Sequence, residues 1–373
     1  MNDLVLKGGR VIDPSQGLDR VTDVAFAGDR VAAIGQGLTG SLIRDVTGQI
    51  VTPGLIDLHT HVYWGGTSLG VDADAYSAQS AVTTCVDAGS AGPGNFAGFQ
   101  AHVIARTTPR ILAYLNISYA GIFAFSATIS VGEAQDMRLM AARAAASVAR
   151  EFKDSIVGIK VRIGAHASGT SGLAPLEIAL DAAQNAGLPI MCHIDEAPPT
   201  YSDTVDLLRK GDVLTHCFRP FPNAPVLHNG QIRDAVLRAR ARGVLFDIAH
   251  GMGSFSWDTA RAMTQAGFWP DTISSDVHAL CIGGPAWDLL RTMTKFLALG
   301  MTLPQVIAAT TQNAALALHR PELGSLKPGS VGDASVIALE NLPTDLEDVT
   351  GQIVPHPQRL MAKGRVMAGL WHD

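Results

Sequence analysis

Eight short apolar runs, separated by helical patterns, constrain the fold more than any other feature of this sequence. Continuous apolar runs that alternate with helices predict a parallel sheet covered by helices. Eight such units favour a closed (β/α)8 TIM barrel. A doubly wound open sheet is the alternative, but no GxGxxG motif follows the first run. The runs cover residues 51–58, 82–87, 111–117, 156–163, 188–194, 212–217, 244–249 and 272–276.

Helical patterns lie between these runs. They cover residues 132–152, 173–186 and 231–242, among others. Ser130 and Glu133 fit a capping box at the start of the first pattern, because a hydroxyl and a carboxyl three residues apart can satisfy free backbone N–H groups. We therefore expect a helix over residues 132–152 that begins with this cap.

The two ends of the chain have a different sequence pattern from its middle. Residues 1–50 contain short β runs broken by Gly-Gly, Gly-Asp and Gly-Gln turns, and "GSLKPGSVGDASVIALE" and "RLMAKGRVMAG" near the C-terminus read in the same way. We expect residues 1–50 and 325–373 to form one small β-sandwich domain. The barrel would then occupy residues 51–324.

Composition narrows the class of protein. Of 373 residues, 47% are hydrophobic and 17% charged, which is typical of a compact enzyme with an extensive core. The net charge is −6, and the sequence has no basic stripe of the kind that nucleic acid requires. It also lacks the run of about 18 apolar residues that would predict a membrane span. Asp3 and Lys7 argue against a signal peptide, and the four widely spaced cysteines read as reduced thiols. We expect a cytoplasmic enzyme with a small-molecule substrate and no nucleic-acid or membrane partner.

Two histidines stand at the end of the first apolar run, in "VTPGLIDLHTHVYWGG". Side chains alternate across a strand, so His59 and His61 project from the same face. Paired imidazoles suit a metal site, although two hydrogen-bonded histidines at a strand end would share this spacing. The remaining ligands must therefore come from elsewhere in the chain.

Polar side chains recur at the ends of the later runs. His193, His216, His250 and Asp276 end the fifth to eighth runs, and Asp87 ends the second. In a (β/α)8 barrel the carboxyl ends of the strands hold the active site. Convergence of so many polar side chains on that end is hard to explain as packing, and it predicts a site there.

The fourth run, "IVGIKVRIG", places two cations on one face. The opposite face is aliphatic and must meet the helices, so Lys160 and Arg162 point into the barrel. A buried unpaired ammonium is costly. Either Lys160 pairs with Asp87 or Asp276, or its neutral amine has combined with CO2 to form a carbamate that can bridge two cations. Carbamate oxygens with imidazole nitrogens suit zinc, or less well manganese or another first-row metal.

Together these motifs resemble the amidohydrolase superfamily of binuclear metal hydrolases, in particular its amidohydrolase/deacetylase branch related to dihydroorotases and hydantoinases. The resemblance covers essentially the full length, through "PGLIDLHTH", "GIKVRIG", "MCHIDEAP", "GDVLTHCF", "ISSDVH" and "TTQNAALALHRPELGSLKPGSVGDASVIAL". It implies two divalent metal ions, with zinc preferred. His59, His61 and Asp276 would bind the first ion and His193 and His216 the second, bridged by carboxylated Lys160 and a hydroxide.

The resemblance also implies an activity. Hydrolysis of an ester or amide bond, with an acetyl or other acyl group, in a small carboxylate-bearing substrate is the expected reaction. Asp276 would act catalytically by moving a proton from the attacking hydroxide to the leaving group. A cyclic amidase of the dihydroorotase or hydantoinase type is the alternative. Some relatives have lost their ligands and serve as scaffolds, but every expected ligand is present here.

Arg162 and His250 are not implied by the resemblance, and their role is inferred from the residues alone. Arg162 lies two residues beyond Lys160 on the same face, where it could grip a substrate carboxylate in a bidentate pair, with a hydrogen bond added by His250. The alternative for Arg162 is a structural partner such as Asp195 or Glu196. Neither the exact substrate nor the oligomeric state, a homo-oligomer included, follows from the sequence.

Overall fold

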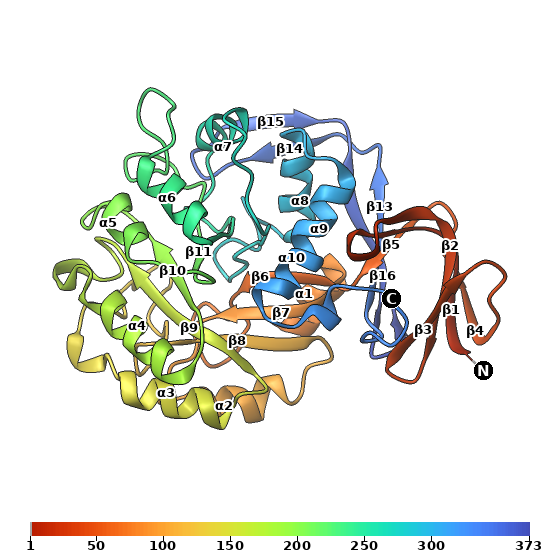
Figure 1. Ribbon diagram of the computed structural model, residues 1–373, viewed down its shortest axis with the longest axis horizontal. Coiled ribbons are helices and arrows are strands. Elements are labelled where there is room, and N and C mark those ends of the chain that lie inside the picture. The colour runs from red at the N-terminus through yellow and green to blue at the C-terminus, as the bar shows by residue number, and fades with distance from the viewer. Residues whose placement is uncertain (1) are drawn as a thin grey trace.

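A seven-stranded parallel sheet forms the centre of the protein, whose computed structural model describes residues 2–373 (Figure 1). Its strands follow one another in space in the same order as in the chain. The sequence therefore predicted its direction and order correctly. The strands are β6 (Leu55–Thr60), β7 (Val82–Ala88), β8 (Arg110–Asn116), β9 (Ile156–Ile163), β10 (Ile190–Ile194), β11 (Val213–Leu214) and β12 (Leu245–Phe246).

The eighth predicted strand, residues 272–276, is not a regular strand. Its segment instead makes two isolated parallel bridges, from Thr272 to Asp247 beside β12 and from Val277 to Thr60 of β6. The backbone N–H of Asp276 also donates to the carbonyl of His59 at 2.8 Å. This segment therefore connects the two edge strands of the sheet, and it brings Asp276 next to the end of β6.

Helices pack around the outside of this sheet (Figure 1). Leu176 and Ala179 of α4 belong to the same apolar cluster as Ile159 of β9, and left-handed Gly187 ends that helix. None of the helices in the described part of the chain has the length and apolarity needed to cross a membrane. The helices are α1 (Ala73–Ser80), α2 (Phe96–Phe99), α3 (Ala142–Glu151), α4 (Ala174–Ala186), α5 (Tyr201–Asp206), α6 (Asp234–Arg242), α7 (Trp257–Gln265), α8 (Leu289–Ala298), α9 (Leu303–Thr310) and α10 (Gln312–Ala317).

The helix predicted over residues 132–152 is wrong in its first half. Its alanine-rich second half forms α3, and its first half contains only a single 3-10 turn, at Met137–Leu139. The helices α4 and α6 match their predictions closely. Glu133 does not cap a helix; its carboxylate accepts a hydrogen bond from Arg162 at 3.1 Å. The backbone N–H of Ala134 likewise donates to Ala167. These tertiary contacts hold the segment as an irregular loop and override its local helix propensity.

Strands from both ends of the chain form one further sheet, as the sequence predicted. Its order is β17-β16-β13-β5-β1-β2-β3, with β4 on β1, and C-terminal β13 pairs antiparallel with N-terminal β5. The strands expected to form a β-sandwich belong to one hydrogen-bonded sheet. Within it, β1 pairs first with β4 and then with β5. Its strands are β1 (Asn2–Asp13), β2 (Leu18–Ala27), β3 (Arg30–Gly35), β4 (Gly40–Asp45), β5 (Ile50–Pro53), β13 (Ala334–Glu340), β16 (Arg359–Met367) and β17 (Leu370–His372); a separate pair comprises β14 (Thr344–Glu347) and β15 (Ile353–His356).

The first predicted run, residues 51–58, spans two strands in different sheets. β5 lies in the terminal sheet and β6 in the central one, and Gly54 separates them. A Cβ atom at this position would collide with the side chain of Thr83. A residue without a side chain is therefore required where the chain passes from one sheet to the other.

Candidate metal centre

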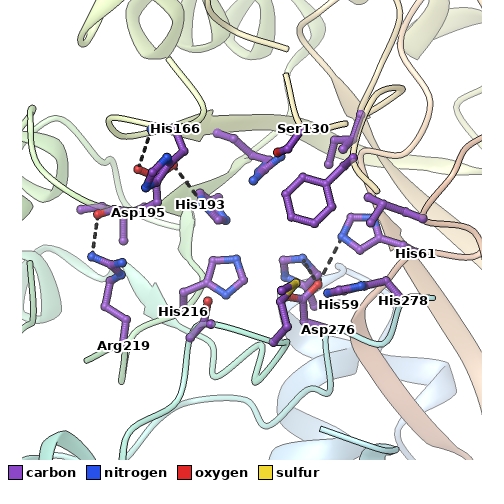
Figure 2. Close-up of a pocket in the computed structure, with 18 of the residues that line it drawn as sticks. His59, His61, Ser130, His166, His193, Asp195, His216, Arg219, Asp276 and His278 are labelled. Carbon is purple, nitrogen blue, oxygen red and sulfur yellow. Dashed lines mark hydrogen bonds and ion pairs between the residues drawn. The ribbon is translucent and has the colours of Figure 1, made fainter. Parts of the chain in front are cut away.

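A cavity of about 330 Å³ opens at the carboxyl ends of the central strands (Figure 2). It is lined by seven of the eight site residues that the sequence predicted; the exception is His250. Residues far apart in the chain therefore converge here, as expected for a parallel sheet with an active site at its carboxyl edge. The seven are His59, His61, Lys160, Arg162, His193, His216 and Asp276.

His59, His61 and Asp276 form a compact group of ligand atoms. The carboxylate Oδ1 of Asp276 lies 3.3 Å from Nε2 of His59 and 3.2 Å from Nε2 of His61. One ligand atom from each residue lies within 4.8 Å of the others, so a single cation could contact all three. The three side chains come from the end of β6 and from the segment that bridges to it.

His193 and His216 lie beside this group. Their ring centroids are 4.4 Å apart, and the ring of His216 lies 5.1 Å from that of His59. Within residues 2–373, Nε2 of His193 is buried and has no hydrogen-bond partner. An unsatisfied buried nitrogen costs free energy unless a ligand takes its lone pair, so this histidine fits a metal ligand.

Hydrogen bonds on the far ring nitrogens orient two of the histidines. Nδ1 of His61 lies 2.9 Å from Ser90 Oγ, and Nδ1 of His216 lies 2.8 Å from the carbonyl oxygen of Ala249. A proton on Nδ1 of His216 donates to that carbonyl and leaves Nε2 as the free lone pair. Such outer partners are typical of metal-binding histidines.

Two of the candidate ligands have an unusual backbone conformation. His216 has φ of 62° and Asp276 has φ of 51°, in the left-handed region that residues with a side chain rarely adopt. Strain of this kind is found mainly at functional sites, where the surrounding structure enforces it. Here the bond from the N–H of Asp276 to His59 helps to hold the conformation.

Lys160 is almost completely buried, with 1% of its surface exposed. Its Nζ lies 3.4 Å from Nε2 of His59, and it has no ion pair with a carboxylate among the described residues. Asp87, one of the two acids suggested by the sequence, instead accepts backbone N–H groups of Val62 and Ser90. Burial lowers the pKa of Lys160 to about 8, which makes the neutral amine accessible near physiological pH.

Burial also sets the charge of the other side chains. It lowers the pKa of His61 to about 3 and places that of His59 well below its usual value, so both imidazoles are neutral at pH 7. The same effect raises the pKa of Asp276 to about 6. Neutral imidazoles and a carboxylate are the donors that zinc takes in proteins, and the residues therefore fit a site for divalent cations.

Arg162 lines the cavity but already has a carboxylate partner. Its Nη1 lies 3.1 Å from Oε2 of Glu133, a buried acid in the loop that precedes α3. The guanidinium also lies 5.1 Å from the ring centroid of Phe125. The structural partner of Arg162 is therefore Glu133, and neither Asp195 nor Glu196 takes that place.

The structure does not bring His250 to the cavity. Its ring is fully buried, stacks on Phe255 and lies with Nε2 2.5 Å from Nζ of Lys295 on α8. The expected hydrogen bond from His250 to a substrate therefore has no support in this geometry. The sequence placed His250 at a strand end but gave no sign of its contact with Lys295.

The sequence did not assign three further residues to the site, although Glu133 was predicted to cap a helix. Arg219 and His278 line the cavity, and Glu133 neutralises Arg162. His278 follows Asp276 by two residues, and its Nδ1 accepts the N–H of Leu280, so a neutral ring carries its proton on Nε2. Proximity to the ligands in "ISSDVH" and "THCFR" was the available signal for His278 and Arg219.

Comparisons with known proteins agree with this geometry. The sequence profile of the amidohydrolase family matches residues 50–367. A deacetylase of Agrobacterium fabrum is 32% identical over 336 residues, which is 89% of this chain and 82% of that protein. A crystal structure of an adenine deaminase has a TM-score of 0.92 at 29% identity, with 100% of both chains covered. One of a dihydroorotase has a TM-score of 0.91 at 29% identity, with 100% and 99% covered.

Proposed function

Because the chain belongs to the amidohydrolase family, and is thus a hydrolase of amide or ester bonds, we propose that it is a binuclear enzyme that removes an acyl group, such as acetyl, from a small carboxylate-bearing substrate. The observation that carries this proposal is the convergence of four histidines, Asp276 and buried Lys160 on one cavity. The similarity of the chain to a protein named deacetylase favours acyl ester or amide bonds as the bonds that it cleaves.

Two divalent cations, with zinc preferred, fit this donor set. His59, His61 and Asp276 would hold one cation, His193 and His216 the other, and Lys160 as a carbamate would contact both. When bound, such ions lower the pKa of water toward neutrality and polarise a carbonyl oxygen. The carbamate is proposed because Lys160 is buried among imidazoles, and an anion there would balance part of the cationic charge.

The side chains of the chain itself would handle protons and position the substrate. Asp276 lies beside His59 and His61, where its carboxylate can accept a proton from the attacking water and pass it to the leaving group. Arg162 and Arg219 line the same cavity, and either can attract an anionic substrate. We assign this chemistry to a (β/α)8 barrel of residues 51–324 in a cytoplasmic enzyme, with residues 1–50 and 325–373 as the small domain.

A cyclic amidase is the second candidate. The similarity of this chain to a dihydroorotase structure over its whole length favours it. Both reactions use the same proposed machinery, because each requires attack of water on an acyl carbon next to a nitrogen or oxygen leaving group. They differ in whether the bond that breaks lies within a ring.

Metal analysis combined with a substrate panel tests the proposal. Pure protein should contain about two divalent cations per chain, and removal by a chelator should abolish hydrolysis that added zinc restores. The panel compares O-acyl hydroxy acids, N-acyl amino acids and cyclic imides; preference for the first two groups supports the acyl hydrolase, and preference for the third supports the cyclic amidase. Full activity in a demonstrably metal-free sample would contradict both.

A further inference from the structure

Arg219 is a buried cation in the cavity wall that no carboxylate neutralises by direct contact. Only 6% of its surface is exposed, and within the described chain it forms no ion pair. Its Nη1 donates to the carbonyl oxygens of Asp195 at 2.6 Å and Asn223 at 3.0 Å. Its Nε is buried without a hydrogen-bond partner among residues 2–373. A buried charge without an ionic partner is costly unless an anion reaches it. Because Nε has almost no accessible surface, an anion in the cavity would have to approach the terminal nitrogens of the guanidinium.

The nearby acids are engaged elsewhere. The carboxylate of Asp195 accepts the backbone N–H groups of His166 and Ala167, and that of Glu196 is half-exposed and lies 3.6 Å from Nε2 of His166. Both acids act on Arg219 only from beyond contact distance. Burial lowers the pKa of Arg219, because Asp195 and Glu196 are too far away to offset the loss of solvation of the guanidinium.

The two arginines of the cavity therefore differ in one decisive respect. Glu133 balances the charge of Arg162 at 3.1 Å, whereas the charge of Arg219 has no such partner in the described residues. A guanidinium that is already paired gains little from a second carboxylate, because the two anions repel one another. An unpaired one gains a charge-assisted hydrogen bond, which is among the strongest that proteins form.

We propose that Arg219 binds the carboxylate of the substrate and so selects anionic acyl compounds. This inference rests on the proposed function. Figure 2 shows Arg219 on the side of the cavity near Asp195 and His216, away from His61 and His278. The substrate carboxylate therefore lies on the side of the second proposed cation, and the acyl carbon points toward Asp276.

Paired esters that differ only in charge test the assignment. We compare O-acetyl-lactate with its methyl ester in the wild-type enzyme and in the variants Arg219→Met, Arg219→Lys and Arg162→Met. Arg219→Met should raise KM for O-acetyl-lactate by about 10- to 100-fold and change that of the methyl ester little, because one charge-assisted contact is lost. Arg219→Lys should retain part of the preference for the anion. Arg162→Met should weaken that preference less than Arg219→Met does, because the direct partner of Arg162 is Glu133.

The outcomes separate the inference from the proposed function. An equal loss on both esters in Arg219→Met would mean that Arg219 only ties the loops of Asp195 and Asn223 together, and it would overturn the inference alone. A wild-type enzyme that hydrolyses neither ester would contradict the proposed acyl substrate, and the inference with it. If Arg219→Met does not fold, as judged by circular dichroism, Arg162→Met decides: loss of the anion preference there would assign the carboxylate to Arg162 instead.

Discussion

Asp276 is the side chain whose chemistry can be tested most cleanly. Asparagine keeps its shape and tolerates the left-handed backbone at this position, where φ is 51°, but it cannot accept a proton in the same way. We expect Asp276→Asn to lower kcat by about 10²- to 10⁴-fold, the usual contribution of a positioned acid–base group, while most of the metal remains bound. Turnover measurements and metal analysis on the same preparation check this.

Asp181→Asn is the matched control for that variant. Asp181 is an exposed acid on α4, outside the cavity, and its substitution should leave kcat and metal content unchanged. Near-normal turnover in Asp276→Asn would assign proton transfer to another residue. His278, which lines the cavity, is then the next candidate, whereas buried His250 is not.

Lys160 is the second side chain whose role can be tested by substitution. Lys160→Ala removes both the amine and the proposed carbamate, and we expect hydrolysis to fall at least 10²-fold. The variant leaves space beside His59, so propionate added with zinc should partly restore activity by supplying carboxylate oxygens there. Lys153→Ala, at an exposed lysine before β9, is the control.

An unmodified Lys160 in the wild-type enzyme would contradict the proposed carbamate. Electron density for a bare ammonium in metal-loaded protein at neutral pH, or rescue of Lys160→Ala by zinc alone, would show that the side chain has a different role.

The strands and their ends were predictable from the sequence because a parallel sheet imposes a simple rule. Runs with apolar side chains on both faces must be covered by helices, and their carboxyl ends meet at one edge. This rule was sufficient to bring His59, His193 and His216 together in one cavity. The shared face of Lys160 and Arg162 also followed from alternation alone. In the structure these two residues pair in register with Met191 and His193 of β10.

The contacts that cross between elements could not be predicted in this way. Glu133 fitted a helix cap by its spacing, but its carboxylate instead binds Arg162 on β9. His250 fitted a site residue by its place at a strand end, but Lys295 lies 45 residues farther along the chain. Such pairs depend on three-dimensional packing, and local patterns contain no information about them.

Helix α8 contains a buried lysine whose ionisation should affect stability. Nζ of Lys295 lies 2.5 Å from Nε2 of His250, and burial lowers its pKa from 10.5 to about 7. Between these values the unfolded chain binds a proton that the folded chain does not, so raising the pH favours folding. The wild-type protein should gain stability relative to Lys295→Met by at most about 1.4 kcal/mol for each pH unit above 7.

Urea unfolding at pH 7, 8 and 9 measures this difference. The wild-type and Lys295→Met curves should separate as the pH rises, and an exposed-lysine variant such as Lys153→Met should remain parallel to the wild type. A constant difference between wild type and Lys295→Met over this range would mean that Lys295 keeps its proton in the folded state.

On the scale of the whole molecule, Asp13 connects the two ends of the chain. This fully buried carboxylate accepts the N–H of Ser15 at 2.9 Å and that of Leu326 at 2.7 Å. Asp13→Ala leaves both donors without a partner and should lower the free energy of unfolding by about 1–3 kcal/mol, while kcat of the folded enzyme stays the same. Asp19→Ala, which removes the half-exposed partner of Arg10, should cost less than about 1 kcal/mol.

Urea denaturation of both variants checks this comparison. Equal losses in Asp13→Ala and Asp19→Ala would indicate that the contact with Leu326 contributes little and that the terminal sheet is held by its strand pairing.

The shared terminal sheet also has a consequence for synthesis of the protein on the ribosome. The N–H of Leu55 donates to Ser335 Oγ, 280 residues farther along the chain, and β5 pairs with β13. At about 5–20 residues per second, the N-terminal strands emerge roughly 15–55 s before their partners. During that interval β5 has an unpaired edge on the side that β13 later covers. We therefore expect the exposed edge of β5 to be a site of aggregation in the nascent chain until β13 has been synthesised.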